Sequence, residues 1–281
     1  MLEIDDPAIE RLTYATTSAE DLAKAIFCTA RGFSGSPEAA PEGAMDWCLG
    51  AQFRAPGEII VLGEPLGPKP PPPQRLAYMQ HACAACFYHG LWFGGCFVLK
   101  DGAGEVVSAA AAFPPSATGS MRDENLLSVP EAERESKSKM LFRELQQLLG
   151  PQLDKEVYEE PGLKRRFGIF EPLLQALEER ALPPGTPHWY VLNFAVSPTA
   201  QGRGYGARLL RWLGRCADHD GVPILLETCG ARNRRFYEGS GFELGAADQM
   251  TDELADRAPK TVEILSMVRQ PRGSNSLAAR L

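Results

Sequence analysis

A glycine-rich segment at residues 201–206 is the feature of the sequence that most clearly suggests chemistry. It has the sequence QGRGYG and lies between an apolar run ending at Val196 and the start of a helical pattern. Gly202, Gly204 and Gly206 carry no side chain, so backbone N–H groups can approach an anion closely there. The N-terminus of the following helix adds free N–H donors and the positive end of its dipole. The spacing therefore predicts a pyrophosphate-binding loop.

Two kinds of nucleotide-binding loop use this physics, and one of them is the dinucleotide fingerprint G-x-G-x-x-G/A. Gly202, Gly204 and Ala207 satisfy it, and Glu227 stands at the distance expected of a ribose-binding acid. However, five residues separate the strand from the loop, and only about 75 residues follow it. The fingerprint normally follows its strand directly and begins a long βαβ series, so the context argues against it.

The other kind is the coenzyme A loop Q/R-x-x-G-x-G/A, which Gln201, Gly204 and Gly206 match at every fixed position. A second signature follows at residues 226–242, LETCGARNRRFYEGSGF, with an Asn, then FYE, then GF. Together with the earlier HWY and VSP these motifs cover about 55 residues. On them the sequence resembles the GCN5-related N-acetyltransferase (GNAT) superfamily, and most of all its puromycin N-acetyltransferase-like branch.

This resemblance implies a mixed α/β (α+β) fold. Its central, mostly antiparallel sheet of about six to seven strands splits between two parallel strands, here 188–196 and 222–228, with helices on both faces and a helical insertion. Acetyl-CoA would bind in the split as the cosubstrate, and no metal is expected. The implied cofactor-binding residues are Phe194, Ala195, Val196, Gln201, Gly202, Arg203, Gly204, Tyr205, Gly206, Ala207 and Asn233. Arg208, Arg211 and Arg215 share one helical face, which either meets the nucleotide phosphates or is solvated.

Tyr237 and Glu227 are the predicted catalytic residues. Acyl transfer from a thioester to an amine needs a neutral amine, a stabilised oxyanion and protonation of the leaving thiolate. Tyr237 occupies the FY position that relatives use as the general acid, although a packed aromatic residue is the structural alternative. Strand alternation places Glu227 on one face with Leu225 and Cys229, and a charge there is costly without a function. Glu227 is therefore the expected base, directly or through water, with a structural hydrogen-bond acceptor as the alternative.

Four potential zinc ligands are crowded into residues 81–89. They are His81, Cys83, Cys86 and His89. A helix turns by about 100° per residue, which directs Cys83 about 200° away from His81. Because the four side chains cannot converge, and structural zinc sites draw their ligands from separate elements, no metal site is predicted.

The composition excludes several classes of protein. The 29 Lys and Arg against 36 Asp and Glu give a net charge of −7, which argues against nucleic-acid binding and weakly favours a cationic acceptor. The seven scattered cysteines do not form the dense, even-numbered pattern of a disulfide framework. The N-terminal sequence MLEIDDPAIE lacks a signal pattern, so a cytoplasmic location is expected. The C-terminal Ala279-Arg280-Leu281 offers a weaker, peroxisomal alternative.

The uncharged stretch 76–99 is long enough to span a bilayer. It nevertheless contains two histidines and is interrupted by three glycines. A buried helix followed by a buried strand is therefore expected, and no membrane partner.

A single acyl-CoA N-acyltransferase domain is expected over residues 1–281, with its core at 8–30, 76–113 and 188–269. Residues 31–75 would be a Pro-rich, irregular insertion, an inert spacer by default or a recognition peptide for a partner. Residues 114–187 would be a helical insertion that caps the acceptor, and 270–281 a flexible tail. The expected strands are 9–14, a hairpin within 94–113, 188–196, 222–228, 241–246 and 261–268. The expected helices are 18–30, 76–89, two within 130–180, 204–219 and 232–239.

The function implied is an acetyl-CoA-dependent N-acetyltransferase that acetylates the amine of a small molecule by direct attack in a ternary complex. Two alternatives stay open. One is a non-catalytic coenzyme A-binding regulatory or scaffold protein, and the other is a transferase that uses a longer acyl-CoA. A monomer and a homodimer are both compatible with the sequence.

Overall fold

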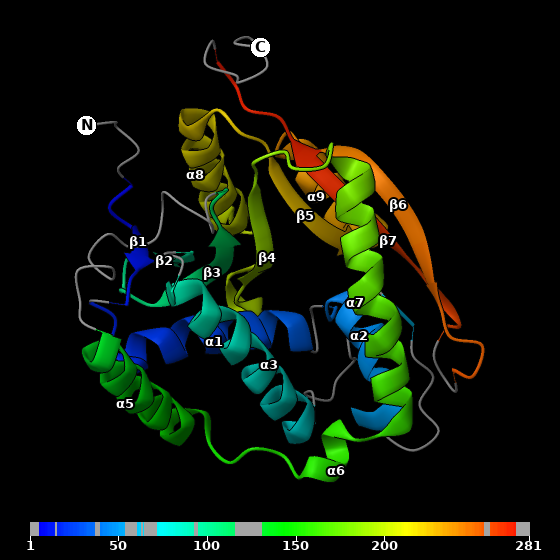
Figure 1. Ribbon diagram of the computed structural model, residues 1–281, viewed down its shortest axis with the longest axis horizontal. Helices are drawn as coiled ribbons and strands as arrows, with labels where there is room; N and C mark the ends of the chain where they lie inside the picture. The colour runs from blue at the N-terminus through cyan, green and yellow to red at the C-terminus, as the bar shows by residue number, and fades with distance from the viewer. Residues whose placement is uncertain are drawn as a thin grey trace.

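Seven strands form one sheet in the order β1-β2-β3-β4-β5-β7-β6 (Figure 1). The structure is a computed structural model that describes residues 6–14, 16–36, 40–53, 61–62, 64, 72–92, 95–115, 131–255 and 259–273. Among these residues the pairing of β4 with β5 is parallel and the other strand pairings are antiparallel. The predicted fold class is confirmed. The strands are β1 (Ile9–Leu12), β2 (Cys96–Lys100), β3 (Val106–Phe113), β4 (Trp189–Val196), β5 (Ile224–Cys229), β6 (Glu243–Thr251) and β7 (Thr261–Arg269).

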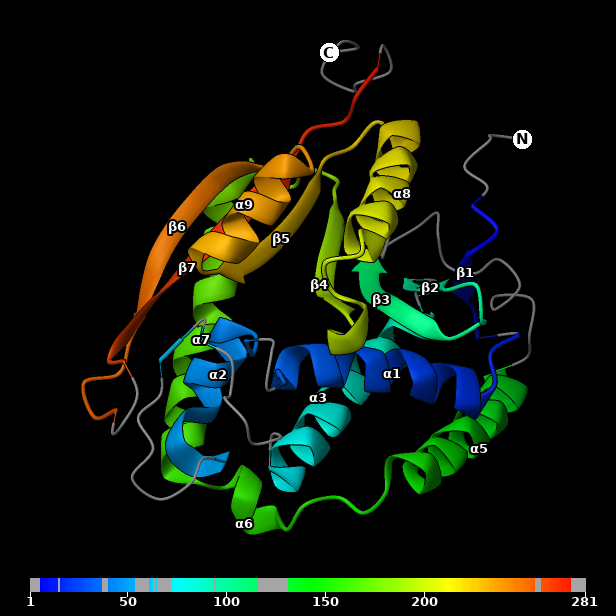
Figure 2. The ribbon, with the colours of Figure 1, turned by 180° about the vertical axis from the view of Figure 1, so that it is seen from behind.

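Helices cover both faces of this sheet (Figure 2). Val98 of β2 packs with α1 and α3, whereas Phe97 and Leu99 pack with α8. In β5, Cys229 packs with α2 and α7, and Leu226 belongs to the cluster on the opposite face. Strand alternation thus separates α1, α2, α3 and α7 from α8 and α9. The helices are α1 (Ala19–Ser34), α2 (Gly43–Leu49), α3 (Pro73–Trp92), α5 (Glu131–Leu149), α6 (Lys155–Tyr158), α7 (Pro161–Ala181), α8 (Tyr205–Asp220) and α9 (Ala231–Gly239).

Local signals explain most of the helix ends. Ser18, the first residue of the helix expected over 18–30, caps α1 by accepting a hydrogen bond from the Asp21 N–H at 3.1 Å, as in a capping box. Gly150 has a φ of 79° and follows the last residue of α5, and Pro161 begins α7, so these two residues mark helix ends within the segment 130–180. The helix predicted over 76–89 runs farther in both directions, to Trp92 at one end and at the other to Pro73, which is tolerated in a first turn.

The expectation that residues 31–75 are irregular is wrong for part of that segment. Helix α1 continues to Ser34, and α2 forms a further helix over Gly43–Leu49. Trp47, Cys48 and Leu49 of α2 are fully buried. A seven-residue helix buried on nearly every side has no amphipathic period, so the sequence pattern gave no signal for it.

Strand β6 is also longer than the expected 241–246. A bulge interrupts its pairing with β7 between Leu244 and Ala246, and the strand then continues to Thr251. A Cβ atom on Gly245 would lie 2.9 Å from the Ala181 Cβ, so this bulge permits α7 to approach the sheet closely. Most of the side chains of β6 are exposed, which weakened the apolar pattern in the sequence.

Some predictions fall outside the described residues. These include most of the proline run within 65–73, the segment 116–130 and the last residues, 274–281, which carry the Ala279-Arg280-Leu281 signal and most of the predicted tail. All seven cysteines are described, and all are free thiols. Within the described part of the chain, no helix is both long enough and apolar enough to cross a membrane.

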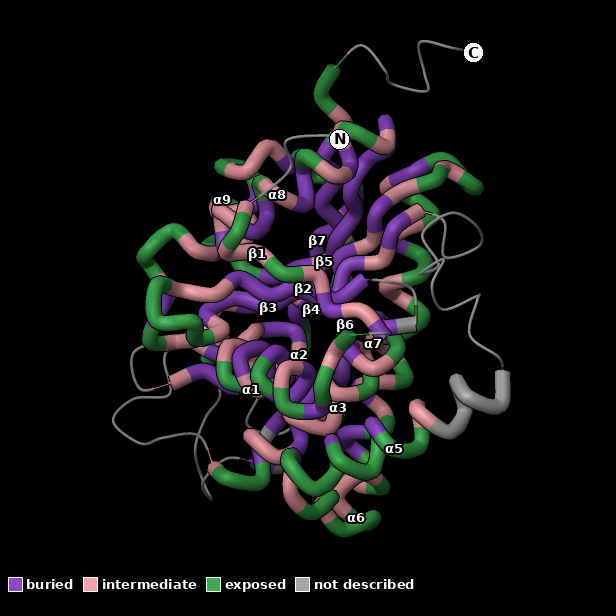
Figure 3. Tube along the Cα trace, turned by 90° about the vertical axis from the view of Figure 1, so that its left-hand side faces the viewer, coloured by how far each residue is buried: buried purple, intermediate pink, exposed green. Residues whose placement is uncertain are grey.

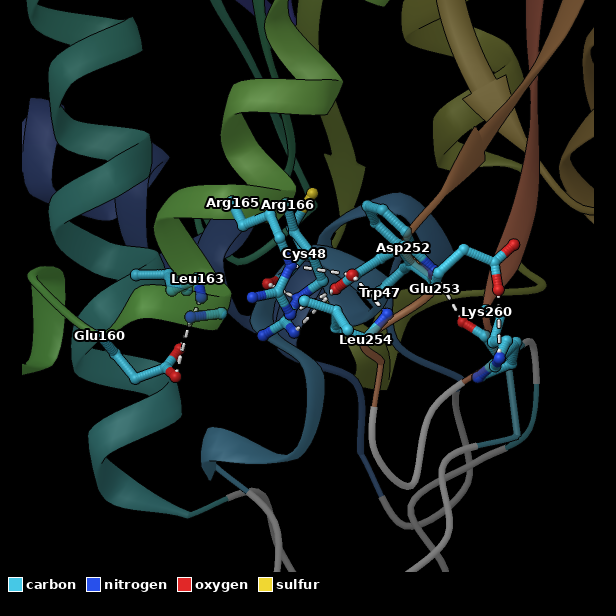
Figure 4. A network of polar contacts seen from close by, with 12 residues as sticks. Trp47, Cys48, Glu160, Leu163, Arg165, Arg166, Asp252, Glu253, Leu254 and Lys260 are labelled. Carbon is cyan, nitrogen blue, oxygen red and sulfur yellow. Dashed lines mark hydrogen bonds and ion pairs between the residues drawn. The ribbon is translucent and has the colours of Figure 1, made fainter.

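Buried residues lie mainly along the central strands and the inner sides of the helices that cover them (Figure 3). The β6–β7 end of this core is joined to α7 and α2 by a polar network (Figure 4). Asp252 accepts hydrogen bonds from Arg165 Nε at 2.8 Å and Nη2 at 2.9 Å, and Arg166 Nη1 lies 3.6 Å from the same carboxylate. Arg166 Nε in turn donates to the Cys48 carbonyl at 2.8 Å. Three segments distant in sequence therefore form one wall.

Trp47 gives a direct test of how much this wall contributes to stability. Its side chain is fully buried, and its Nε1 donates to the Pro259 carbonyl at 2.9 Å (Figure 4). We expect Trp47→Ala to lower the free energy of unfolding by about 3–5 kcal/mol, because it leaves a large cavity. Trp47→Phe keeps an aromatic ring and removes the hydrogen bond, so we expect a loss of about 1 kcal/mol. Denaturant unfolding measures both, and equal effects would contradict the packing argument.

Candidate active site

The sheet splits between β4 and β5. Only two residue pairs join these parallel strands, Trp189 with Ile224 and Tyr190 with Leu225. Both strands are fully described, and beyond Tyr190 the edge of β4 that faces β5 has no strand partner. Backbone N–H and C=O groups along an unpaired edge can pair with an extended ligand as they would with another strand.

A bulge in β4 determines which face of the sheet each side chain of this strand points to. Asn193 pairs with Ala111 and Val191 pairs with Ala112, so Leu192 is the additional residue. Before the bulge Trp189 and Val191 pack on the α8 side, and after it Phe194 and Val196 do so. The bulge therefore reverses the alternation of the strand.

A cavity of about 1100 Å³ opens at this split. It is lined by α1, α2, α3, α7, β4, β5, β7, the glycine loop and α9. Almost all the predicted site residues are brought together here. They are Phe194, Ala195, Val196, Gln201, Gly202, Gly204, Tyr205, Gly206, Ala207, Glu227, Asn233 and Tyr237. Arg203 is not among the lining residues; it is exposed, with its guanidinium 5.4 Å from the centre of the Tyr205 ring.

The glycine loop has a backbone that suits an anion site. Gly202 has a φ of 75° and Gly204, the N-cap of α8, has a φ of 84°. A Cβ atom on either would meet nothing within 4 Å. The positive φ, and not steric crowding, therefore explains why glycine occupies these two positions. At Gly206 a Cβ would lie 3.0 Å from Val196 Cγ2, so this glycine permits close packing of the helix on the strand. The N–H groups of the first turn of α8 are consequently directed to one open end of the cavity.

The arginines near this loop are used differently from one another. Arg208 forms a bidentate pair with Asp6, with Nε to Oδ2 at 2.7 Å and Nη2 to Oδ1 at 2.5 Å. Arg211 and Arg215 are exposed on the same helix. Arg232, which the sequence reading did not select, donates from Nη2 to Gln201 Oε1 at 3.2 Å. Arg232 thus connects the glycine loop to the first turn of α9.

Glu227 lies in the part of the cavity where β4 and β5 begin to diverge. Its Oε2 accepts a hydrogen bond from the Tyr190 hydroxyl at 2.8 Å. Its Oε1 is buried and has no hydrogen-bond partner among the described residues. Burial raises the pKa of Glu227 to about 7, with the nearby Glu178 acting in the same direction and the Tyr190 hydrogen bond opposing them. A carboxylate that changes protonation near neutral pH can take a proton from an amine.

Tyr237 is buried in the last turn of α9, with 8% of its surface exposed. Its ring contacts Phe236 and Phe242 at centroid distances of 5.1 and 5.7 Å. Burial raises the pKa of this phenol above its ordinary value, and the neighbouring Glu42 and Cys229 raise it further. The hydroxyl is therefore protonated at neutral pH and available as a proton donor.

Glu42 is a cavity residue that the sequence reading missed. It is the N-cap of α2, and its Oε2 accepts from the Met45 N–H at 2.7 Å. The Cys229 thiol lies 3.6 Å from Glu42 Oε1 and donates to it. Burial raises the pKa of Glu42. No catalytic motif marks this glutamate, and the one local signal was its capping position before a short apolar run.

The histidines and cysteines of α3 do not assemble a metal site. Within the described ranges, no group of three His, Cys, Asp or Glu side chains is placed to hold a metal ion. His81 contacts the Pro151 carbonyl at 3.4 Å, whereas Cys83 is buried in the core. The α3 residues that reach the cavity are Tyr78, Met79, Ala82, Cys83 and Cys86.

The cavity at the split of a mixed sheet, with a glycine loop on its wall, is the feature to compare with known proteins. Residues 172–244 match the family model described as an acetyltransferase (GNAT) domain. That stretch runs from within α7 to the start of β6 and includes the split, the loop and Tyr237. Residues 172–244 are therefore assigned to a GNAT acetyltransferase domain.

One curated relative and two solved structures illustrate what the chain is similar to. A Schizosaccharomyces pombe protein named as an uncharacterized N-acetyltransferase is 32% identical over 111 residues, which are 39% of this chain and 43% of the relative. The match thus spans less than half of that relative. The C-terminal condensation domain of Ebony, solved with beta-alanyl-dopamine, superposes with a TM-score of 0.52 at 11% identity, over 93% of this chain and 98% of that one. The structure described as histone acetyltransferase HPA2 and related acetyltransferase from Corynebacterium glutamicum superposes with a TM-score of 0.44 at 17% identity. The superposition covers 95% of this chain and 98% of that one.

Proposed function

We propose that the protein is an acetyl-CoA-dependent N-acetyltransferase that acetylates a small-molecule amine by direct attack in a ternary complex. The observation that carries the proposal is the single cavity at the β4–β5 split. It joins an anion-binding loop to a carboxylate and a phenol, Glu227 and Tyr237. The puromycin N-acetyltransferase-like branch remains a prediction from the sequence.

The residues present fit coenzyme A. The unpaired edge of β4 at Phe194, Ala195 and Val196 would pair with the extended arm, as a further strand would. N–H groups of the loop 202–207 would hold the pyrophosphate at the N-terminus of α8. Gln201 fixes this loop, since its Nε2 donates to the Val196 carbonyl at 3.3 Å while its Oε1 accepts from Arg232. When bound, acetyl-CoA supplies an activated acetyl group on a thiolate leaving group.

The two catalytic side chains would handle the protons of the transfer. Glu227 Oε1, which is buried and free of a partner among the described residues, would take a proton from the acceptor ammonium. The neutral amine then has the lone pair that forms the new C–N bond. Tyr237 Oη would give its proton to the sulfur as the C–S bond breaks, and the proton lost by the attacking nitrogen would return the Tyr237 phenolate to a phenol.

The other half of the cavity would receive the acceptor. Its wall includes Tyr78 of α3 together with Phe167, Phe170 and Leu174 of α7. Helix α7 lies within the segment 114–187, which the sequence reading expected to cap the acceptor. We therefore propose that this helix, held to α2 and β6 by the network around Asp252, contributes to the choice of amine.

Release of free coenzyme A from the full chain tests the function. With acetyl-CoA and a panel of primary alkyl and arylalkyl amines, we expect release that depends on the amine and an acetylated amine by mass spectrometry. Propionyl-CoA and butyryl-CoA, used in parallel, test the length of the acyl chain. Tight binding of acetyl-CoA with no turnover of any amine would contradict the proposal and support a regulatory or scaffold protein.

A further inference from the structure

Carboxylates dominate the charged groups that line the cavity. The charged side chains on its wall are Glu42, Glu171, Glu227 and Arg232, counted over the described residues. Arg232 is engaged with Gln201 at the glycine loop, on the cofactor side. The acceptor side of the described wall therefore has three carboxylates and no cation. A positively charged ligand complements the ionised form of such a surface.

Glu42 is the carboxylate of this set that the transfer step does not use. Its described hydrogen-bond partners are the Met45 and Ala44 N–H groups and the Cys229 thiol, none of which carries a positive charge. The cations that contact α2 or its network are already matched: the buried Arg75 pairs with Asp46 at 2.9 Å, and the buried Arg166 and the half-buried Arg165 pair with Asp252. A carboxylate in a largely apolar cavity is costly unless a counter-charge arrives.

Glu42 and Glu227 occupy different points along the cavity. Glu227 and Cys229 point to the same face of β5 two residues apart, which separates them by about 7 Å. Glu42 reaches β5 at Cys229, with 3.6 Å between its Oε1 and the Cys229 sulfur. A Cβ on Gly43 would lie 2.5 Å from the same sulfur, so the start of α2 is fitted closely to this end of the strand. The two carboxylates therefore meet the cavity at different residues of β5, with Glu42 beside Cys229 and Tyr237 and Glu227 at the beginning of the split, so they can meet two separate groups of one ligand.

We propose, on the basis of the proposed function, that the acceptor is an amine with a second positive charge. Its reacting nitrogen lies between Glu227 and Tyr237, and its second cationic group pairs with Glu42. Glu42 is then a specificity-determining residue. The aromatic and aliphatic side chains of α3 and α7 pack against the apolar segment that joins the two charges.

Matched acceptors test this assignment. The pairs are 1,5-diaminopentane with 1-aminopentane, and 1,4-bis(aminomethyl)benzene with 4-methylbenzylamine, each assayed with acetyl-CoA and the full chain. We expect kcat/KM to favour the diamine of at least one pair by about 10- to 100-fold, the range of one charge-assisted hydrogen bond. Glu42→Gln should remove this preference, chiefly by raising KM for the diamine, while the monoamine is little affected.

Two further variants separate charge from structure. Glu42→Asp keeps the charge and the capping oxygen, so it should retain part of the preference. Glu179→Gln makes the same charge change on the exposed side of α7 and should leave the preference intact. The thermal midpoint and the acetyl-CoA affinity of each variant show whether the fold is retained.

The outcomes are distinguishable. Acetylation of both members of each pair with equal kcat/KM would overturn this inference and leave the proposed function standing. An equal loss for diamine and monoamine in Glu42→Gln, with the fold retained, would also overturn it, because Glu42 would then act on the reacting nitrogen. Acetylation of no amine at all would overturn the proposed function and this inference with it.

Discussion

Tyr237→Phe is expected to lower kcat by about 10²- to 10⁴-fold, the usual contribution of a positioned general acid. The variant removes one oxygen and keeps the ring that packs against Phe236 and Phe242. The glycine loop and the edge of β4 are not altered, so the affinity for acetyl-CoA should stay nearly constant. The loss must therefore appear in kcat and not in cofactor binding.

Steady-state kinetics and acetyl-CoA titration on the same preparation measure the two quantities. Tyr88→Phe is the matched control, since its hydroxyl contacts Ser138 outside the cavity. If Tyr237→Phe turned over at the rate of the unaltered protein, Tyr237 would be a packed aromatic residue and not the acid. A parallel loss of acetyl-CoA affinity would instead indicate a displaced α9.

Glu227→Gln is expected to change both the rate and its pH dependence. Burial raises the pKa of Glu227 to about 7, so the fraction that can accept a proton increases as the pH rises through 7. The kcat/KM of the unaltered protein should therefore rise across this range, since an alkylamine titrates well above it. Glutamine cannot accept the proton, and we expect kcat/KM to fall by about 10²- to 10⁴-fold and to lose the inflection near 7.

The ionisation of Glu227 also makes the stability of the protein depend on pH. A carboxyl whose pKa is raised in the folded state stabilises the fold while it is protonated, and this contribution is lost as the pH rises through about 7. Relative to Glu227→Gln, the unaltered protein should therefore become less stable from pH 6 to pH 8. Glu243→Gln, an exposed carboxylate at the start of β6, is the control. An inflection near 7 that survives in Glu227→Gln would assign it to another group.

The sequence predicted the cofactor side of the molecule more completely than the acceptor side. The loop at 201–206, its flanking strand and helix, and the capping box at Ser18 are local features, because neighbouring residues determine each of them. The topology followed from the resemblance in these motifs. Almost all the residues chosen for the site line one cavity, although their roles remain predictions.

The acceptor side could not be predicted in this way because contacts distant in sequence form it. Glu42 reaches the cavity only through the packing of α2 against Cys229, which lies 187 positions later. Tyr190 was not expected to donate to Glu227, because that hydrogen bond depends on the register of β4 against β5. Arg208 is paired with Asp6, and no helical pattern indicates a partner 202 positions away.

The wall formed by α2, α7 and the β6–β7 hairpin has a consequence for biosynthesis. A chain emerging from the ribosome gains the glycine loop and α8 well before Asp252 and Pro259, which hold α7 and Trp47 in place. Domains fold as units when their last required segment is available. The wall of the cavity therefore cannot be completed until the residues that carry Asp252 and Pro259 have been synthesised.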